Sequence, residues 1–383
     1  MEAAVDAIKR LAASAAVFFA FAGVSFAEDY AAVQGYVHSF NNSVSVYTGV
    51  FSLNKDLNLD TSVSFKYAID LINPDGEDHD DDEGGVAVVS GASSAVNGGS
   101  DTRHAVTVGV SHNFSNIIGV EAYYDYSAEK DYKSSTPTLT LKKDLFDKNT
   151  TLTAGYSRNS DTIDGQFMTG EADRTTDNFF AGVTQVLSPV MVAQIGYSHS
   201  NSSGYLSEGI RLVPLGTTDA ATCVAVSVDC AIEAFPSERN AYIIGVSRYF
   251  TEGLAGLMDR SAVKLTFRYY DDSWDVNSWM GEAEFHKYLV DNLIMRLNYR
   301  YYTQSEAFFV KDTYAAPDVY KSSSPQIQEK DTNLVGLKFT YLIADPVQAW
   351  KVAVNSLEAK YEFYTESIGV DAHVFMGGLR LSF

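Results

Sequence analysis

Side chains of alternating polarity run through segment after segment of this chain. Between Leu59 and Leu71, the odd-numbered side chains are Leu, Thr, Val, Phe, Tyr, Ile and Leu, whereas the even-numbered ones are Asp, Ser, Ser, Lys, Ala and Asp. The same alternation recurs at 105–114, 118–126 and 263–269. A period of two is typical of a β-strand with one apolar and one polar face. The pattern therefore predicts an all-β protein.

The links between the expected strands alternate in length, and this alternation indicates whether the apolar faces point inward or toward lipid. A soluble sandwich turns them inward, whereas a bacterial outer-membrane barrel turns them to lipid and has short periplasmic turns and long outer loops. The alternation favours the membrane barrel. Short links lie at 54–56, 115–116, 147–149, 188–189 and 291–292, and long links at 72–102, 160–175, 201–239 and 304–330.

Tyrosines gather just before the long links, in segments such as EAYYDYS, IGYSHSN and NYRYYTQS. Barrels carry aromatic girdles at the membrane interfaces, whereas a general preference of Tyr for strands predicts no bias toward one strand end. We therefore predict a transmembrane antiparallel β-barrel of about 16 strands. The strands are expected near 30–39, 43–53, 57–71, 103–114, 118–128, 136–145, 150–158, 177–187, 190–199, 240–250, 262–271, 277–288, 292–303, 331–342, 351–364 and 369–383.

The first 27 residues have the anatomy of a secretory signal. Lys9 and Arg10 precede an apolar run from Leu11 to Val24, and the small residues Ser25 and Ala27 are placed for cleavage after Ala27. A run of 14 residues is shorter than the roughly 20 that a membrane helix needs. We expect residues 1–27 to be a cleaved signal peptide and 28–383 to be a single barrel domain, exported by the general secretory pathway to the outer membrane.

The last ten residues, VFMGGLRLSF, keep the period of two to the end of the chain. A terminal strand with a final aromatic residue resembles the C-terminal signature that outer-membrane proteins present to the barrel-insertion machinery. We therefore expect that machinery to bind the strand that ends in Phe383, and the last strand to pair with the first so that no sheet edge stays open.

The formal net charge of −21 argues against binding nucleic acid, because phosphate contacts need basic surfaces. The expected partners are instead outer-membrane lipid and lipopolysaccharide, with a periplasmic or surface protein as a further candidate. Cys223 and Cys230 are the two cysteines. After export to an oxidising compartment they are expected to form a disulfide, since their spacing suits neither a redox C-x-x-C nor a zinc site.

Seven short motifs are distributed along the chain. In order they are DTRH (101–104), YSAEKDY (126–132), KNTTL (148–152), TQVLS (184–188), SGYL (203–206), RYYDDSW (268–274) and RYYTQSEA (300–307). Together they resemble the motifs of a bacterial family known only as a domain of unknown function, whose members are expected to form outer-membrane barrels. The resemblance implies no catalytic residues, and it associates such proteins with envelope redox systems.

Charged residues on the polar faces of the second half of the chain are the candidate site. Signs broadly alternate between neighbouring strands, so two interpretations stand: a charge ladder that sets a transverse field and filters solutes, or ion pairs that only hold the wall together. The candidate lumen charges are Lys264, Arg268, Glu282, Glu284, His286, Arg296, Arg300, Lys338, Glu358, Lys360 and Glu362.

Two groups of residues are candidate metal ligands. Glu282, Glu284 and His286 share one face of a strand, but basic residues on both flanking strands oppose a cation there. An acidic run within a long outer loop lacks the Gly and the final Glu of an EF-hand. It is expected to be a solvated loop, with divalent-cation binding and bridging to lipopolysaccharide phosphates as the alternative. Its acidic residues are Asp75, Glu77, Asp78, Asp80, Asp81, Asp82 and Glu83.

Enzyme chemistry and cofactor binding find little support in the sequence. No G-x-S-x-G motif occurs, and Asp271 with Asp272 at a strand end is the one arrangement reminiscent of a barrel protease. No C-x-x-C-H motif for haem is present. We expect a porin-like channel for small polar solutes or ions, because 16 strands enclose an aqueous lumen. The alternative is a sheath that houses a partner protein of an envelope electron-transfer system.

Overall fold

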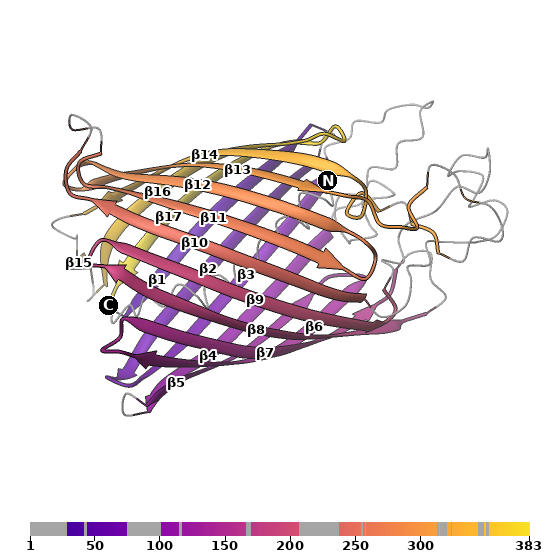
Figure 1. Ribbon diagram of the computed structural model, residues 1–383, viewed down its shortest axis with the longest axis horizontal. Coiled ribbons are helices and arrows are strands. Elements are labelled where there is room, and N and C mark those ends of the chain that lie inside the picture. The colour runs from indigo at the N-terminus through magenta and orange to yellow at the C-terminus, as the bar shows by residue number, and fades with distance from the viewer. Residues whose placement is uncertain are drawn as a thin grey trace.

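The computed structural model of the protein is one closed antiparallel β-barrel (Figure 1). Sequential strands pair with one another, and β1 (Tyr30–Phe40) pairs with β17 (Asp371–Ser382), which closes the ring. The two-residue β15 (Gln348–Ala349) pairs only with β16, which itself pairs with β14, so sixteen strands form the wall. The structure describes residues 29–41, 44–74, 101–114, 117–165, 170–206, 237–253, 256, 258–311, 314, 320–322, 324–343, 348–349 and 352–383.

The remaining strands follow in chain order. They are β2 (Val44–Asn58), β3 (Thr61–Pro74), β4 (Asp101–Phe114), β5 (Ile118–Ala128), β6 (Tyr132–Leu145), β7 (Thr150–Ile163), β8 (Ala172–Ser188), β9 (Met191–Gly204), β10 (Ser237–Phe250), β11 (Ser261–Asp272), β12 (Asn277–Val290), β13 (Leu293–Gln304), β14 (Lys330–Leu342) and β16 (Val352–Glu366).

The register keeps the two faces of the sheet continuous around the ring. Phe65 on β3 lies opposite Phe51 on β2 and Val108 on β4, and all three are exposed on the outward side. The neighbouring Lys66 lies opposite polar Ser52, on the inward side. Side chains directly opposite each other on paired strands lie on the same face of the sheet. The register therefore aligns the apolar face of each strand with the apolar faces of its two neighbours. An apolar outward face with a polar interior is the pattern of a barrel that spans lipid.

The two ends of the barrel differ in their connections. The end that carries the links 75–100, 164–171, 205–236 and 305–329 is called the long-loop end here, and the opposite end, where Phe383 lies, the short-turn end. Figure 1 shows the C-terminus at the short-turn end. Within the described residues, no helix is long and apolar enough to cross a membrane.

The strand boundaries differ from the sequence-based expectation at one turn. The link expected at 54–56 belongs to β2, which continues to Asn58 through a bulge, and the turn is formed by Leu59 and Asp60. The side chain of Asn58 accepts a hydrogen bond from the backbone N–H of Asp60, 2.9 Å away. Leu59 therefore lies fully exposed in a turn rather than on the strand face, because the side chain of Asn stabilises a turn at that point.

Strands β6 to β9 are longer at the long-loop end than their sequence pattern predicted. The strand expected to begin at residue 136 begins at Tyr132. The β6–β7 pairing skips Thr136 and Pro137 and resumes at Ser135, opposite Ser160. Proline lacks a backbone N–H, so the ladder is interrupted there without ending. The polar residues that were expected in loops instead extend these strands.

An outward belt of tyrosines marks one membrane boundary near the long-loop end. Their hydroxyls are hydrogen-bonded to polar side chains on the outward face. Along the strands, the belt therefore separates an apolar band at mid-height of the barrel from the polar residues near the loops. A Tyr ring with its hydroxyl satisfied in this way suits a membrane interface. The pairs are Tyr67 with His104, Tyr156 with Asp177, Tyr197 with Asn240, Tyr269 with Asn277, Tyr299 with Asn333, Tyr301 with Asp331 and Tyr361 with His373.

Candidate functional site: the inward-facing charges

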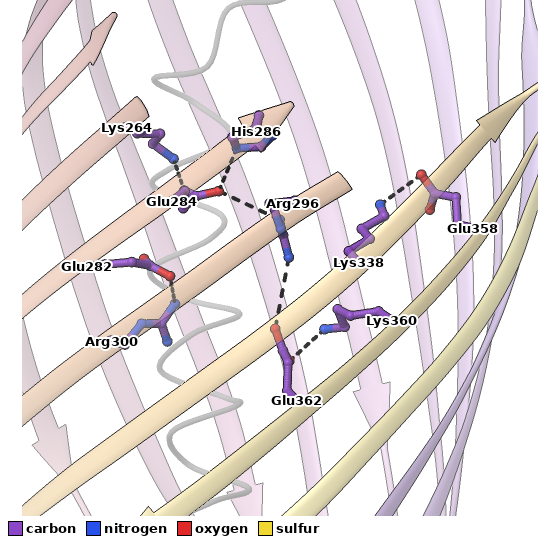
Figure 2. Close-up of polar contacts among 10 residues, drawn as sticks. All are labelled: Lys264, Glu282, Glu284, His286, Arg296, Arg300, Lys338, Glu358, Lys360 and Glu362. Carbon is purple, nitrogen blue, oxygen red and sulfur yellow. Dashed lines mark hydrogen bonds and ion pairs between the residues drawn. The ribbon is translucent and has the colours of Figure 1, made fainter. Parts of the chain in front are cut away.

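The candidate lumen charges all lie on the inward face of one wall, formed by β11, β12, β13, β14 and β16. Each belongs to a strand whose alternate residues carry the outward apolar side chains, so the parity of each strand turns the charges inward. Figure 2 shows ten of the eleven side chains together on these neighbouring strands. The eleventh, Arg268, lies over the ring of Tyr270, with its guanidinium carbon 5.5 Å from the ring centroid.

Four close ion pairs connect this wall. Lys264 lies 2.8 Å from Glu284, Arg300 3.0 Å from Glu282, Lys338 2.8 Å from Glu358, and Lys360 2.7 Å from Glu362. The side chains are 11–30 % exposed, so they line the interior rather than lying in a packed core. Each carboxylate thus has one close cationic partner. Three of these pairs join neighbouring strands, whereas Lys360 and Glu362 both lie on β16. The pairs leave little net charge of their own.

Arg296 on β13 is outside these four pairs and has no carboxylate of the described residues as close as theirs. Its Nη1 is 3.8 Å from Glu284, and its Nη2 is 4.0 Å from Glu362. Both carboxylates have closer partners, as Figure 2 shows with Arg296 between them. The separations exceed the 2.7–3.2 Å typical of an N–H···O hydrogen bond. The Nε of Arg296 has no hydrogen-bond partner within the described part of the chain.

The register aligns basic residues directly opposite one another. His286 lies opposite Arg296, Arg296 opposite Lys338, and Lys338 opposite Lys360, which makes one inward row across four strands. Sequence patterning indicated alternating signs between neighbouring strands, and this holds for Glu282 opposite Arg300. It does not hold in this row, where the compensating carboxylates lie in the adjacent rows. We call His286, Arg296, Lys338 and Lys360 the basic row.

Gly336 makes room for the crowded centre of this wall. A Cβ at that position would lie 2.3 Å from Oδ1 of Asn298 and 2.9 Å from Cγ of Glu362. Asn298 separates Arg296 from Arg300 on β13 and is 6 % exposed. Glycine therefore lets the side chains of the two flanking strands approach each other over β14.

Two inward-facing carboxylates lie on β5, which stands across the sixteen-strand ring from β13. Glu121 pairs with Lys142 at 2.6 Å, whereas Asp125 accepts a hydrogen bond from the hydroxyl of Thr107 at 2.5 Å. Asp125 has no ion pair with another described residue.

At the long-loop end, the described parts of the link 305–329 pack against the ends of β11 and β13. Phe309 and Ile327 lie in one buried cluster with Trp274 and with inward-facing Tyr270 of β11. The side-chain amide of Gln304, the last residue of β13, donates hydrogen bonds to the backbone oxygens of Gln326 and Gln328 at 2.7 and 2.6 Å. The sequence pattern predicted only a long link here and did not predict these contacts.

The metal candidates divide between described and undescribed residues. Glu284 and His286 approach to 3.2 Å, but Lys264 and Arg296 surround the same carboxylate. Among the described residues, no group of three His, Cys, Asp or Glu side chains is placed to hold a metal ion. The acidic run 75–83, the Cys223–Cys230 pair and the expected signal peptide lie outside the described residues.

Asp271 and Asp272, considered for protease chemistry, point to opposite faces of β11. Asp271 faces outward and accepts a hydrogen bond from Asn240 at 3.1 Å. Asp272 faces inward, and its Oδ1 accepts hydrogen bonds from the backbone N–H groups of Trp274 and Val276 at 2.9 and 3.0 Å. Consecutive strand residues cannot act on one substrate from the same face. Asp272 instead stabilises the turn between β11 and β12.

Sequence comparison agrees with the motif resemblance. Residues 3–170 and 164–382 match the family described as "Protein of unknown function (DUF3570)". The chain belongs to this family. No curated protein matches the sequence.

Solved structures with similar folds are membrane barrels of low sequence identity. A bacterial polysaccharide outer membrane secretin matches with TM-score 0.48 and 8 % identity, over 93 % of this chain and 98 % of its own. A BenF-like porin from Pseudomonas fluorescens Pf-5 matches with TM-score 0.45 and 7 % identity, over 94 % and 99 %. The siderophore receptor PirA from Pseudomonas aeruginosa matches with TM-score 0.43 and 8 % identity, over 88 % of this chain. This chain spans 56 % of that receptor's length.

Proposed function

We propose that the protein is a passive channel for small polar solutes or ions in the outer membrane of a bacterium. The observation that carries the proposal is the closed sixteen-strand wall with an apolar outward face and a polar, ion-paired inward face. Barrels of 16–18 strands leave an aqueous channel, and an inward face lined with charges is compatible with water. In this proposal, residues 1–27 direct export and are removed.

The charge distribution supports weak selectivity rather than strong exclusion of one sign. Most inward carboxylates of the β11–β16 wall have a close cationic partner, so the formal charge of −21 does not translate into an acidic lumen. The positive charge of Arg296 on one wall and the negative charge of Asp125 on the other are not closely paired. In this proposal they orient dipolar solutes instead of repelling all anions or all cations.

Single-channel recording in a planar bilayer tests the proposal. Refolded mature protein is expected to give steady, ohmic conductance, and a KCl gradient is expected to give only a small reversal potential. Folding is verified independently by heat-dependent mobility on a gel. A correctly folded barrel that inserts into the bilayer and carries no current would refute the channel.

A sheath that houses a partner protein is the second candidate. The observation that favours it is an apolar cluster of inward-facing side chains near the long-loop end, which a water-filled pore does not need. Its buried members are Phe40, Val44, Val46, Ile72, Tyr364 and Ala372. A silent barrel whose lumen protects a co-purifying periplasmic or surface protein from protease would support the sheath over the channel.

A further inference from the structure

We propose that Arg296 is the centre of an oxyanion-binding site in the lumen, which takes small solutes with a carboxylate or phosphate group. The inference rests on the proposed channel function and names its solute class. It is drawn from the geometry of the basic row and from the way its neighbouring carboxylates are already engaged.

The first step is the balance of charge around Arg296. The four carboxylates nearest to the basic row each have a cation within 3.0 Å, namely Lys264, Arg300, Lys338 and Lys360. Arg296 approaches two of these carboxylates only at 3.8 and 4.0 Å. Its charge is therefore shared with groups that are already neutralised, which leaves a net positive potential at the centre of the wall.

The second step is hydrogen bonding. A guanidinium has five N–H donors in a planar fork that matches a carboxylate or phosphate. Arg296 makes no hydrogen bond to a described side chain or backbone group. Its side chain is 28 % exposed while its Nε is buried, so an oxyanion from the lumen would be bound by the Nη1 and Nη2 groups. An incoming oxyanion supplies the acceptors that the wall does not.

The third step is the neighbourhood. His286 and Lys338 lie directly opposite Arg296 on the two flanking strands, at the spacing of one sheet pair. An anion on Arg296 therefore lies between two further basic side chains. Charge-assisted hydrogen bonds of this kind are roughly twice as strong as neutral ones.

The test is binding of inorganic phosphate to the full-length mature barrel in detergent, measured by isothermal titration calorimetry. The wild type is expected to bind with an affinity in the millimolar range, and Arg296→Gln to bind about tenfold or more weakly, since a hydrogen bond to a charged group contributes roughly 1.5–3 kcal/mol. Lys66→Gln is the matched control. Lys66 is an exposed inward cation on β3, far around the ring, and its removal changes the net charge by the same amount.

Arg296→Lys distinguishes loss of the binding site from a folding defect, because it retains the positive charge in the wall. It keeps the charge without the planar fork and is expected to bind with intermediate affinity. Absence of phosphate binding by the wild type overturns the inference, as does equal weakening by Arg296→Gln and Lys66→Gln, which would indicate a general charge effect.

Bilayer recording separates this inference from the channel itself. Phosphate is expected to block the chloride current of the wild type and of Lys66→Gln, but not of Arg296→Gln. If the wild type conducts and phosphate neither binds nor blocks, the oxyanion site fails while the channel stands. If phosphate binds in calorimetry and the folded barrel stays silent, the channel fails while the site stands.

Discussion

Arg296 and Lys338 lie directly opposite each other on the inward faces of β13 and β14, two cations in register in adjacent strands. Like charges in this position destabilise a sheet unless they are compensated. Compensation comes from carboxylates one row away, with Glu358 2.8 Å from Lys338 and Glu362 near both Arg296 and Lys360. The wall therefore keeps basic side chains together without the full repulsion they would otherwise experience.

Glu362→Gln tests this compensation. The substitution removes the anion that lies 2.7 Å from Lys360 and 4.0 Å from Arg296, so these two cations of the basic row lose a shared counter-charge. We expect the free energy of unfolding to fall by about 1–3 kcal/mol, the usual range for a buried charged group left without its partner. Urea unfolding in lipid vesicles measures it.

The same variant should also conduct with a higher chloride-to-potassium permeability ratio. Glu171→Gln is the matched control, because Glu171 is 60 % exposed and lies 4.0 Å from Lys133. An exposed pair of this kind contributes little. Equal behaviour of the two variants would contradict a role of Glu362 in the lumen charge balance.

Asp125→Asn tests the opposite wall. Asp125 faces inward without a cationic partner among the described residues, and Asn keeps an acceptor for the hydroxyl of Thr107. We therefore expect little change in stability and a shift of the reversal potential toward anion preference, because the lumen loses an unneutralised negative charge. Asp144→Asn, at an exposed position of the short-turn end, should shift the reversal potential less. A larger effect at Asp144 would place the selective region near that rim.

Gln304→Ala tests the ordered segment at the mouth. The substitution removes the two hydrogen bonds to the backbone oxygens of Gln326 and Gln328, and also the acceptor of the Tyr302 hydroxyl. We expect the segment 305–329 to be cleaved faster by protease and the open-channel current to become noisier, while the barrel keeps its unfolding midpoint. Gln328→Ala is the control, since it retains the backbone oxygen that Gln304 binds. Unchanged cleavage in Gln304→Ala would show that the apolar contacts of Phe309 and Ile327 suffice.

Leu297→Arg tests the position of the membrane. Leu297 is an exposed outward residue of β13 in the apolar band, and Thr303 lies on the same face beyond the tyrosine belt. Arg at the bilayer midplane lowers barrel stability by about 2–4 kcal/mol, whereas near an interface the loss is about 0–1 kcal/mol. We expect these values for Leu297→Arg and Thr303→Arg, respectively, in vesicle unfolding. Equal losses would argue against the membrane boundary that the tyrosines indicate.

Much of the barrel could be predicted because a strand's period of two is a local property. The alternation around Phe65, the link lengths and the C-terminal strand together predicted the antiparallel barrel, its strand number and the inward parity of each candidate charge. The turn at Leu59 and Asp60 was misplaced, since the Asn58 side chain and a bulge shift it by several residues. The strand expected to begin at residue 136 likewise begins four residues earlier, at Tyr132.

The sequence by itself thus determined which face of each strand is polar, because alternation needs no knowledge of partners. Only the tertiary structure decided which charges meet. The register sets Lys264 opposite Glu284 but Arg296 opposite Lys338. A shift of one strand by two residues would keep the inward parity of its side chains and change every pair that this strand makes. Pairing depends on hydrogen bonds and side-chain contacts between strands, such as the close approach over Gly336, and these exist only in the closed barrel.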